Sequence, residues 1–142
     1  MFPSIFRAGF LWKDARLVQN SNQSMKLMIV DNHKETRALI RELIGGFARE
    51  ILECTGGGEA AAHCADFQPD LVTMDLDMPL ASGIETTRRV LANNPAARII
   101  VITRYNSIDV RTAAARAGAS HFFAKDNLAG LTPYVERLLA RS

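Results

Sequence analysis

The chain has 142 residues, of which 48% are hydrophobic, and its formal net charge at neutral pH is +2. This length suits one domain with a sizeable core, and the nearly balanced charge argues against direct nucleic-acid binding or an anionic membrane surface. No apolar run reaches the ~20 residues of a membrane helix, and the run over 8–12 is too short for a signal peptide, so we expect a cytoplasmic protein with no membrane contact.

The first residues differ from the rest of the chain. Residues 1–24 end in the polar run Gln-Asn-Ser-Asn-Gln-Ser. Their apolar side chains could line one helical face and dock, or the segment could be a loose arm without a specific function, as termini commonly are. We therefore predict an N-terminal extension and linker over 1–24 and one domain over 25–142.

Short apolar runs then alternate with helical patterns. The expected strands are 27–30, 51–54, 71–74, 99–102 and 122–124. Five helices are expected. The first has an apolar face over 39–44, the second ends near residue 67, the third covers 84–93, the fourth covers 108–117, and the fifth begins at Thr132. We predict that Thr132 caps the last helix, with Pro133 at its first position, and that Gly118 closes the helix before it. The glycines at 56–58 lack the strand–GxGxxG–helix frame of a dinucleotide site and indicate a turn.

Three of the expected strands are continuous apolar runs. Such runs are typical of strands covered on both faces, and therefore of a parallel sheet with crossover helices. Five strands alternating with five helices predict an α/β, doubly wound, open five-stranded parallel sheet.

Polar residues of complementary kinds follow four of these strands. In an open α/β sheet ligands bind outside the carboxyl ends of the strands. Those ends carry Asp31-Asn32, Asp75 with Asp77, Thr103 and Lys125. A carboxylate can be a nucleophile that forms an acyl phosphate, Mg²⁺ prefers carboxylate and carbonyl oxygens, and a lysine and a hydroxyl can hold phosphoryl oxygens.

Residues 25–142 resemble the receiver domain of bacterial two-component response regulators. The resemblance rests on Met28-Ile29-Val30-Asp31, on the run from Pro69 through Asp75 and Asp77 to Pro79, on Ser82-Gly83, on Ile100-Val101-Ile102-Thr103, and on the run from Ala117 through Phe122 to Lys125-Asp126. The resemblance implies the flavodoxin-like strand order 2-1-3-4-5.

The resemblance also implies roles for these residues. Asp75 is the expected phosphoryl acceptor, Thr103 and Lys125 contact the phosphoryl group, and Phe122 is a switch aromatic that repacks when Thr103 moves. The expected Mg²⁺ ligands are Asp31, Asn32, Asp75 and the backbone carbonyl of Asp77. More conservatively, Asp75 is a loop acid, Lys125 a surface lysine, Thr103 a strand residue and Phe122 part of the core.

The sequence departs from the family pattern at three positions. The family usually has a second acid after the first strand, where this chain has Asn32, so we predict weakened Mg²⁺ binding. Arg104 replaces a small residue beside the pocket; it could be solvated, crowd the phosphodonor, or clamp the phosphoryl group. Leu80 stands where glycine is frequent. His33 and His121 are expected to be surface or packing residues.

Two cysteines are too few for a disulfide framework. We expect Cys54 and Cys64 to be reduced, half-buried thiols. A metal site made from Cys54, His63 and Cys64 is disfavoured, since the spacing matches no zinc pattern and a fourth ligand is missing.

The leading functional hypothesis is a receiver domain phosphorylated by a histidine kinase or phosphotransfer protein. The expected output runs through an unidentified protein or a homodimer, using the face of the fourth helix, fifth strand and fifth helix. No DNA-binding module fits after Lys125, so we expect a stand-alone receiver or a fragment. A pseudo-receiver that no longer uses phosphate is the alternative. We expect no enzyme activity: the Asp75-Leu76-Asp77 spacing of haloacid-dehalogenase phosphatases follows the wrong strand here.

Overall fold

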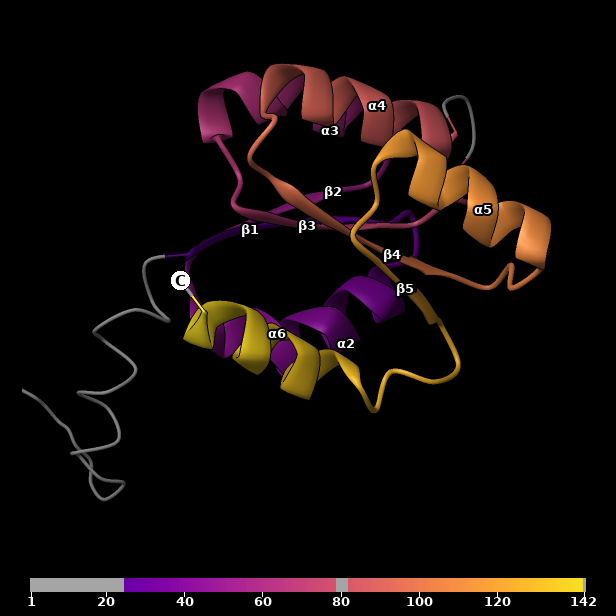
Figure 1. Cartoon of the computed structure of the whole chain (residues 1–142). Helices are drawn as coiled ribbons and strands as arrows, with labels where there is room; N and C mark the ends of the chain where they lie inside the picture. The colour runs from indigo at the N-terminus through magenta and orange to yellow at the C-terminus, as the bar shows by residue number, and fades with distance from the viewer. Residues whose placement is uncertain (1–24, 79–81, 142) are drawn as a thin grey trace, which may run out of the picture.

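The computed structural model describes residues 25–78 and 82–141 (Figure 1). The predicted extension over 1–24 lies outside the described residues, as do Pro79 and Leu80 of the loop that follows Asp77.

The described chain forms one five-stranded sheet in the order β2-β1-β3-β4-β5. The strands are β1 (Met25–Val30), β2 (Ala48–Cys54), β3 (Leu71–Met74), β4 (Arg98–Thr103) and β5 (His121–Ala124). Every neighbouring pair is parallel. The predicted doubly wound sheet and its flavodoxin-like strand order are confirmed.

Helices cover both faces of the sheet. They are α2 (Lys34–Ile44), α3 (Gly57–Phe67), α4 (Gly83–Asn93), α5 (Ile108–Ala117) and α6 (Leu131–Ala140), and a 3-10 turn (Gly45–Phe47) follows α2. Figure 1 shows α3, α4 and α5 on one face, with α2 and α6 on the other. Among the described residues, no helix is long and apolar enough to cross a membrane.

The central strands are buried on both sides because alternate side chains enter two different cores. On β1, Met28 and Val30 belong to the core under α3, α4 and α5, whereas Leu27 and Ile29 belong to the core under α2 and α6. Each of these four side chains is at most 1% exposed. Burying a side chain of this size contributes roughly 1.5–3 kcal/mol, so the two cores fix the register of the strands and the edge where they end.

Several local predictions need correction. Thr132 does not cap the last helix: Gly130 holds the cap position, and the Thr132 hydroxyl instead donates to the Leu43 carbonyl of α2 at 2.9 Å. The glycine run is not only a turn, since Gly57 and Gly58 begin α3. Both cysteines are free and fully buried, not half-buried.

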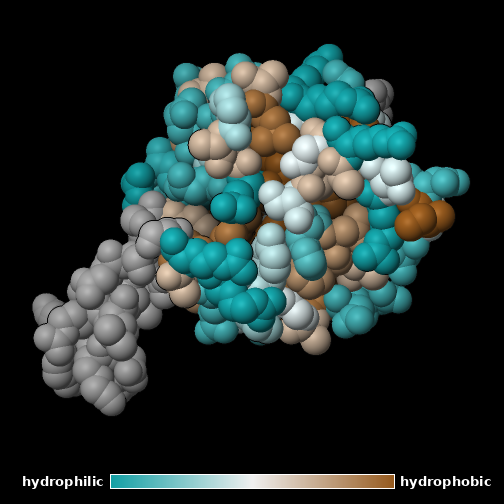
Figure 2. Space-filling model, in the orientation of Figure 1, coloured by the Kyte–Doolittle hydropathy of each residue, from teal (hydrophilic) through white to brown (hydrophobic). Residues whose placement is uncertain are grey.

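Gly118 ends α5 as predicted. Its φ of 113° lies in the left-handed region, which glycine adopts without strain. Figure 2 shows hydrophilic colour around the periphery of the face drawn there, with hydrophobic colour through its centre and at its right edge.

Candidate functional site

The four strand ends place four polar side chains along one edge of the sheet. Asp31 follows β1, Asp75 follows β3, Thr103 ends β4 and Lys125 follows β5. Asp31 and Asp75 are each 1% exposed. The parallel ladder continues one residue past β3 and β5: the Asp75 N–H donates to the Val30 carbonyl at 3.0 Å, and the Lys125 N–H donates to the Thr103 carbonyl at 2.9 Å. The residues that carry the site are therefore held by the sheet itself.

Lys125 joins the acids at the centre of the site. Its Nζ lies 3.0 Å from Asp31 Oδ2 and 3.2 Å from Asp75 Oδ2. The lysine side chain is only 11% exposed, so this ammonium group is fixed between two buried carboxylates. A positive charge in that position can hold the oxygens of an anion that arrives at Asp75.

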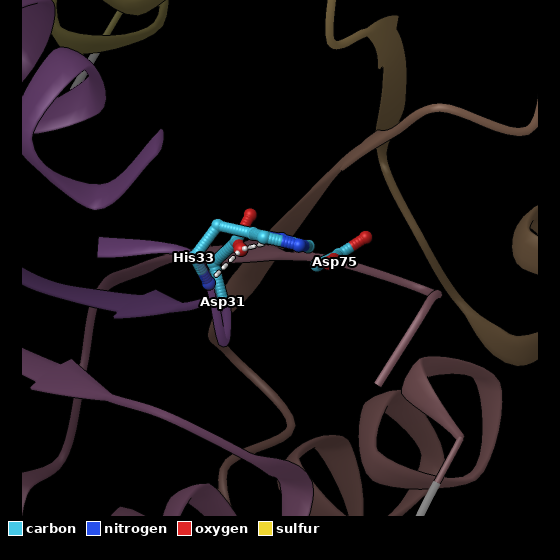
Figure 3. Close-up of side chains that lie close together, drawn as sticks. All are labelled: Asp31, His33 and Asp75. Carbon is cyan, nitrogen blue, oxygen red and sulfur yellow. Dashed lines mark hydrogen bonds and ion pairs between the residues drawn. The ribbon is translucent and has the colours of Figure 1, made fainter. Parts of the chain in front are cut away.

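His33 also belongs to this cluster: its side chain is 44% exposed, in keeping with the predicted surface residue, but the sequence did not reveal its contacts with the site. Its main-chain N–H donates to Asp31 Oδ1 at 2.8 Å, and its Nδ1 lies 3.2 Å from the same oxygen. The same Nδ1 lies 3.3 Å from Lys125 Nζ. Figure 3 shows the His33 ring beside Asp31 and directed toward Asp75. The signal in the sequence was its position two residues after a strand-end aspartate, where an Asx turn folds the chain back.

Burial dominates the electrostatics of Asp75. It raises the pKa of the Asp75 carboxyl above its usual value, and the nearby charge of Asp31 raises it further. The hydrogen bond from the Asp77 N–H to Asp75 Oδ1, at 3.1 Å, and the charge of Lys125 act in the opposite direction. The balance describes a carboxylate with less solvation than an exposed one.

Arg37 connects the main chain of Asp31 to a side chain of β2. Its Nη1 donates to the Asp31 carbonyl at 2.8 Å, and its Nε donates to Glu53 Oε1 of β2 at 2.8 Å. Arg41 also donates to Glu53, at 2.9 Å. Burial alone would raise the pKa of Glu53, but the hydrogen bonds and charges of the two arginines lower it. Arg37 thus ties the Asp31 backbone to the neighbouring strand.

The remaining predicted residues lie around this centre. The Thr103 hydroxyl is buried and accepts a long contact, 3.5 Å, from the Tyr105 N–H. Phe122 is half-buried against the core, with the Arg111 guanidinium 5.1 Å from its ring centroid. Asn32 is exposed. Arg104 is exposed at the surface and hydrogen-bonded to the Asp77 carboxylate.

The side chains at this site can be compared with the ligands that Mg²⁺ prefers. Within the described residues, one group of side chains could share a metal ion: Asp31, His33 and Asp75. The possible ligand atoms of these three residues all lie within 4.8 Å of one another. Asp31 Oδ2 is buried and has an ion pair with Lys125 but no hydrogen bond, which leaves a lone pair for a cation. Two buried carboxylates suit a hard cation; an imidazole nitrogen does not, so His33 is better placed to orient Asp31 than to bind Mg²⁺.

Comparison with known proteins agrees with this arrangement. A family model described as the response regulator receiver domain matches residues 27–135. A Thermotoga maritima chemotaxis protein CheY is 32% identical over 101 residues, which cover 70% of this chain and 84% of that protein. The crystal structure of a LuxR-family two-component response regulator from Aurantimonas is 33% identical, with a TM-score of 0.73 over 84% of this chain and 87% of that one.

One group of relatives is much longer than this chain. A protein-glutamate methylesterase/protein-glutamine glutaminase from Pseudomonas fluorescens is 43% identical over 79 residues, and these cover 54% of this chain but only 24% of that enzyme. The chain therefore matches about a quarter of the length of such relatives.

The fold, the strand-end acids and the family match define the class of the protein. The chain belongs to the response regulator receiver family, the phosphorylation-controlled switch domains of two-component signalling.

Proposed function

We propose that Asp75 is the phosphoryl acceptor of this receiver domain. The observation that carries the proposal is the position of Asp75: a buried carboxylate at a strand end, with Lys125 Nζ 3.2 Å from Oδ2 and a second buried carboxylate, Asp31, on the same ammonium. A nucleophile next to a fixed cation, at the ligand-binding edge of a doubly wound sheet, suits attack on a phosphorus atom.

Each neighbouring residue has a task in this transfer. An Asp75 oxygen forms the new bond to phosphorus, and the bond to the leaving group breaks with its electron pair on that group. Lys125 holds the phosphoryl oxygens with its positive charge, and the Thr103 hydroxyl donates a hydrogen bond to them. Low solvation at Asp75 favours the reaction, because the carboxylate loses little hydration when its charge passes to the phosphoryl group.

We also propose the Mg²⁺ ligands. Asp31 and Asp75 supply carboxylate oxygens, Asp77 its main-chain carbonyl and Asn32 an amide oxygen. When bound, Mg²⁺ neutralises charge on the phosphoryl oxygens. Asn32 brings no charge, so the expected affinity is weaker than in receivers with an acid at this position.

The wider biology is a further part of the proposal. The phosphodonor is a histidine kinase or phosphotransfer protein. The output is a change at Thr103 and Phe122, which an unidentified protein or a homodimer recognises through the face of α5, β5 and α6.

The proposal also covers the domain bounds and the location. The receiver domain spans 25–142 after an N-terminal extension over 1–24, acts in the cytoplasm, and has no chemistry beyond its own phosphorylation.

Intact-mass analysis after incubation with acetyl phosphate and Mg²⁺ tests the assignment. The wild-type chain should gain one phosphoryl group, and Asp75→Ala should gain none. No mass gain in the wild type, combined with no spectral change on adding beryllofluoride, would favour a pseudo-receiver instead.

A further inference from the structure

Arg104 and Asp77 form an ion pair at the rim of the site, here called the Arg104–Asp77 clasp. Arg104 follows Thr103 at the end of β4, and Asp77 lies two residues after Asp75 at the end of β3. Since β3 and β4 are neighbours in the sheet, the clasp joins the two loops that border the acceptor. The Arg104 guanidinium also lies 5.9 Å from the centroid of the Tyr105 ring.

One residue of the clasp also contacts the acceptor through its main chain. The main-chain N–H of Asp77 donates to Asp75 Oδ1 at 3.1 Å, so the residue that holds Arg104 is itself hydrogen-bonded to Asp75. The Arg104 side chain is 59% exposed and the Asp77 side chain 32%, so the ion pair has room to rearrange. The exposed Arg104 side chain is therefore held by the residue whose main chain is bonded to Asp75, and it is free to exchange partners.

The charges at the site make such an exchange favourable. Lys125 is already shared by Asp31 and Asp75, whereas among the described residues Arg104 pairs with the single carboxylate of Asp77. A phosphoryl group carries about −1.5 to −2 charge at neutral pH and has three acceptor oxygens, against a single charge on a carboxylate. Arginine's planar fork also matches a phosphoryl group bidentately.

We propose that Arg104 is a second phosphoryl-binding cation, which Asp77 binds until Asp75 is phosphorylated. The inference rests on the proposed phosphorylation of Asp75. With acetyl phosphate as donor, an Asp75 oxygen bonds to phosphorus, the bond from phosphorus to the acetyl oxygen breaks, and acetate leaves with the electron pair. Arg104 then exchanges the Asp77 carboxylate for the phosphoryl oxygens, and Asp77 competes with the phosphoryl group for the same guanidinium.

The two halves of the clasp should therefore act in opposite directions. Arg104→Ala removes a ligand and should weaken beryllofluoride binding and shorten the lifetime of the phosphorylated chain. Asp77→Asn removes the competitor but keeps the main-chain N–H and carbonyl, and should strengthen binding and lengthen the lifetime. In the double variant, Asp77→Asn should have no further effect, because the arginine it would release is absent.

The experiment uses the full chain with Mg²⁺ present. Calorimetric titration measures beryllofluoride affinity, and intact mass follows loss of the phosphoryl group after acetyl phosphate is removed. A charge-assisted hydrogen bond predicts a change of roughly 3- to 10-fold in each direction, lower than for a buried pair because Arg104 is exposed. Arg104→Lys should restore part of the loss.

Arg89→Ala is the matched control. Arg89 is 60% exposed, pairs with Glu85 at 3.6 Å and lies on α4 away from the site, so its removal should change neither measurement.

The outcomes separate this inference from the function on which it rests. Shifts in the same direction for Arg104→Ala and Asp77→Asn would mean that the clasp only blocks access, and would overturn the proposal. Unchanged affinity in both variants would reduce the clasp to a surface ion pair and would overturn it too. A wild-type chain that neither gains mass nor binds beryllofluoride would reject the proposed function itself, and the clasp with it.

Discussion

Asp75 carries a charge that the fold buries. Burial, and then the charge of Asp31, raise the pKa of this carboxyl above its value in the unfolded chain. A group with a raised folded-state pKa contributes stability below its unfolded pKa, and that contribution is lost as pH rises through the folded pKa. At neutral pH the ionised Asp75 is therefore a cost to stability that the site needs for its chemistry.

Asp75→Asn should consequently stabilise the fold, and more so as pH rises from about 4 toward neutrality. The amide has the same shape and no charge to desolvate, and Lys125 keeps its ion pair with Asp31. We expect a higher free energy of unfolding than wild type at pH 7.5, measured by urea denaturation. Asp66→Asn, which removes an exposed carboxylate on α3, is the control. A gain that is constant with pH, or a loss at pH 7.5, would contradict the argument.

Asn32 is the second residue at which the effect of a single charge can be tested, because its replacement by aspartate adds one. Asn32→Asp adds a carboxylate next to Asp31 at the exposed rim of the site, so it should strengthen Mg²⁺ binding about tenfold, or ~1.4 kcal/mol, in a calorimetric titration. Asn93→Asp makes the same change at the far end of α4 and should leave the affinity unaltered. Equal affinities for wild type and Asn32→Asp would remove Asn32 from the proposed ligand set.

At the scale of the elements, sequence reasoning was strongest where a local pattern decides the structure. The apolar run over 71–74 gave β3 to the residue, and α5 begins and ends as predicted because Gly118 supplies the left-handed residue at its end. Sequence reasoning failed where a residue far away in the chain determines a side chain's contacts. The Thr132 hydroxyl bonds to the Leu43 carbonyl across two helices, and the place of the His33 ring depends on a loop turn and on Lys125, 92 residues away.

The start of α4 is another contact between elements that has a direct test. A Cβ at Gly83 would lie 2.6 Å from Leu76 Cα and overlap the Asp75 carbonyl oxygen, so this helix packs directly on the backbone of the acceptor. Gly83→Ala must push that backbone away and should destabilise the fold by roughly 1–3 kcal/mol and weaken beryllofluoride binding.

Gly58→Ala provides the opposite case in the same measurements. An added Cβ at Gly58, in the first turn of α3, meets nothing within 4 Å. Alanine favours the helix over glycine, so this variant should be about 0.5–1 kcal/mol more stable, with beryllofluoride binding unchanged. A loss of stability for Gly58→Ala as large as that for Gly83→Ala would show that the close backbone contact at Gly83 is not the cause of the loss.

At the scale of the whole molecule, the two cysteines report on opening of the core. Cys54 ends β2 and Cys64 lies on α3, and both belong to the core under α3, α4 and α5 with no exposed surface. Burial raises the pKa of the Cys54 thiol to about 12, which keeps it protonated at any pH where the fold is studied. Since the thiolate is the reactive form, Cys54 should be inert until the core opens.

A phosphoryl analogue at Asp75 should therefore slow thiol labelling far from the site. The native chain should react little with a disulfide reagent at pH 8, and the chain unfolded in urea should release two equivalents, matching its two cysteines. Mg²⁺ with beryllofluoride at 100 times its dissociation constant stabilises the folded state by about 2.7 kcal/mol, so labelling that requires global unfolding should slow about 100-fold. Asp75→Ala should lose this protection entirely. Protection much below 100-fold in the wild type would mean that α3 opens locally, with the site still folded and the analogue still bound.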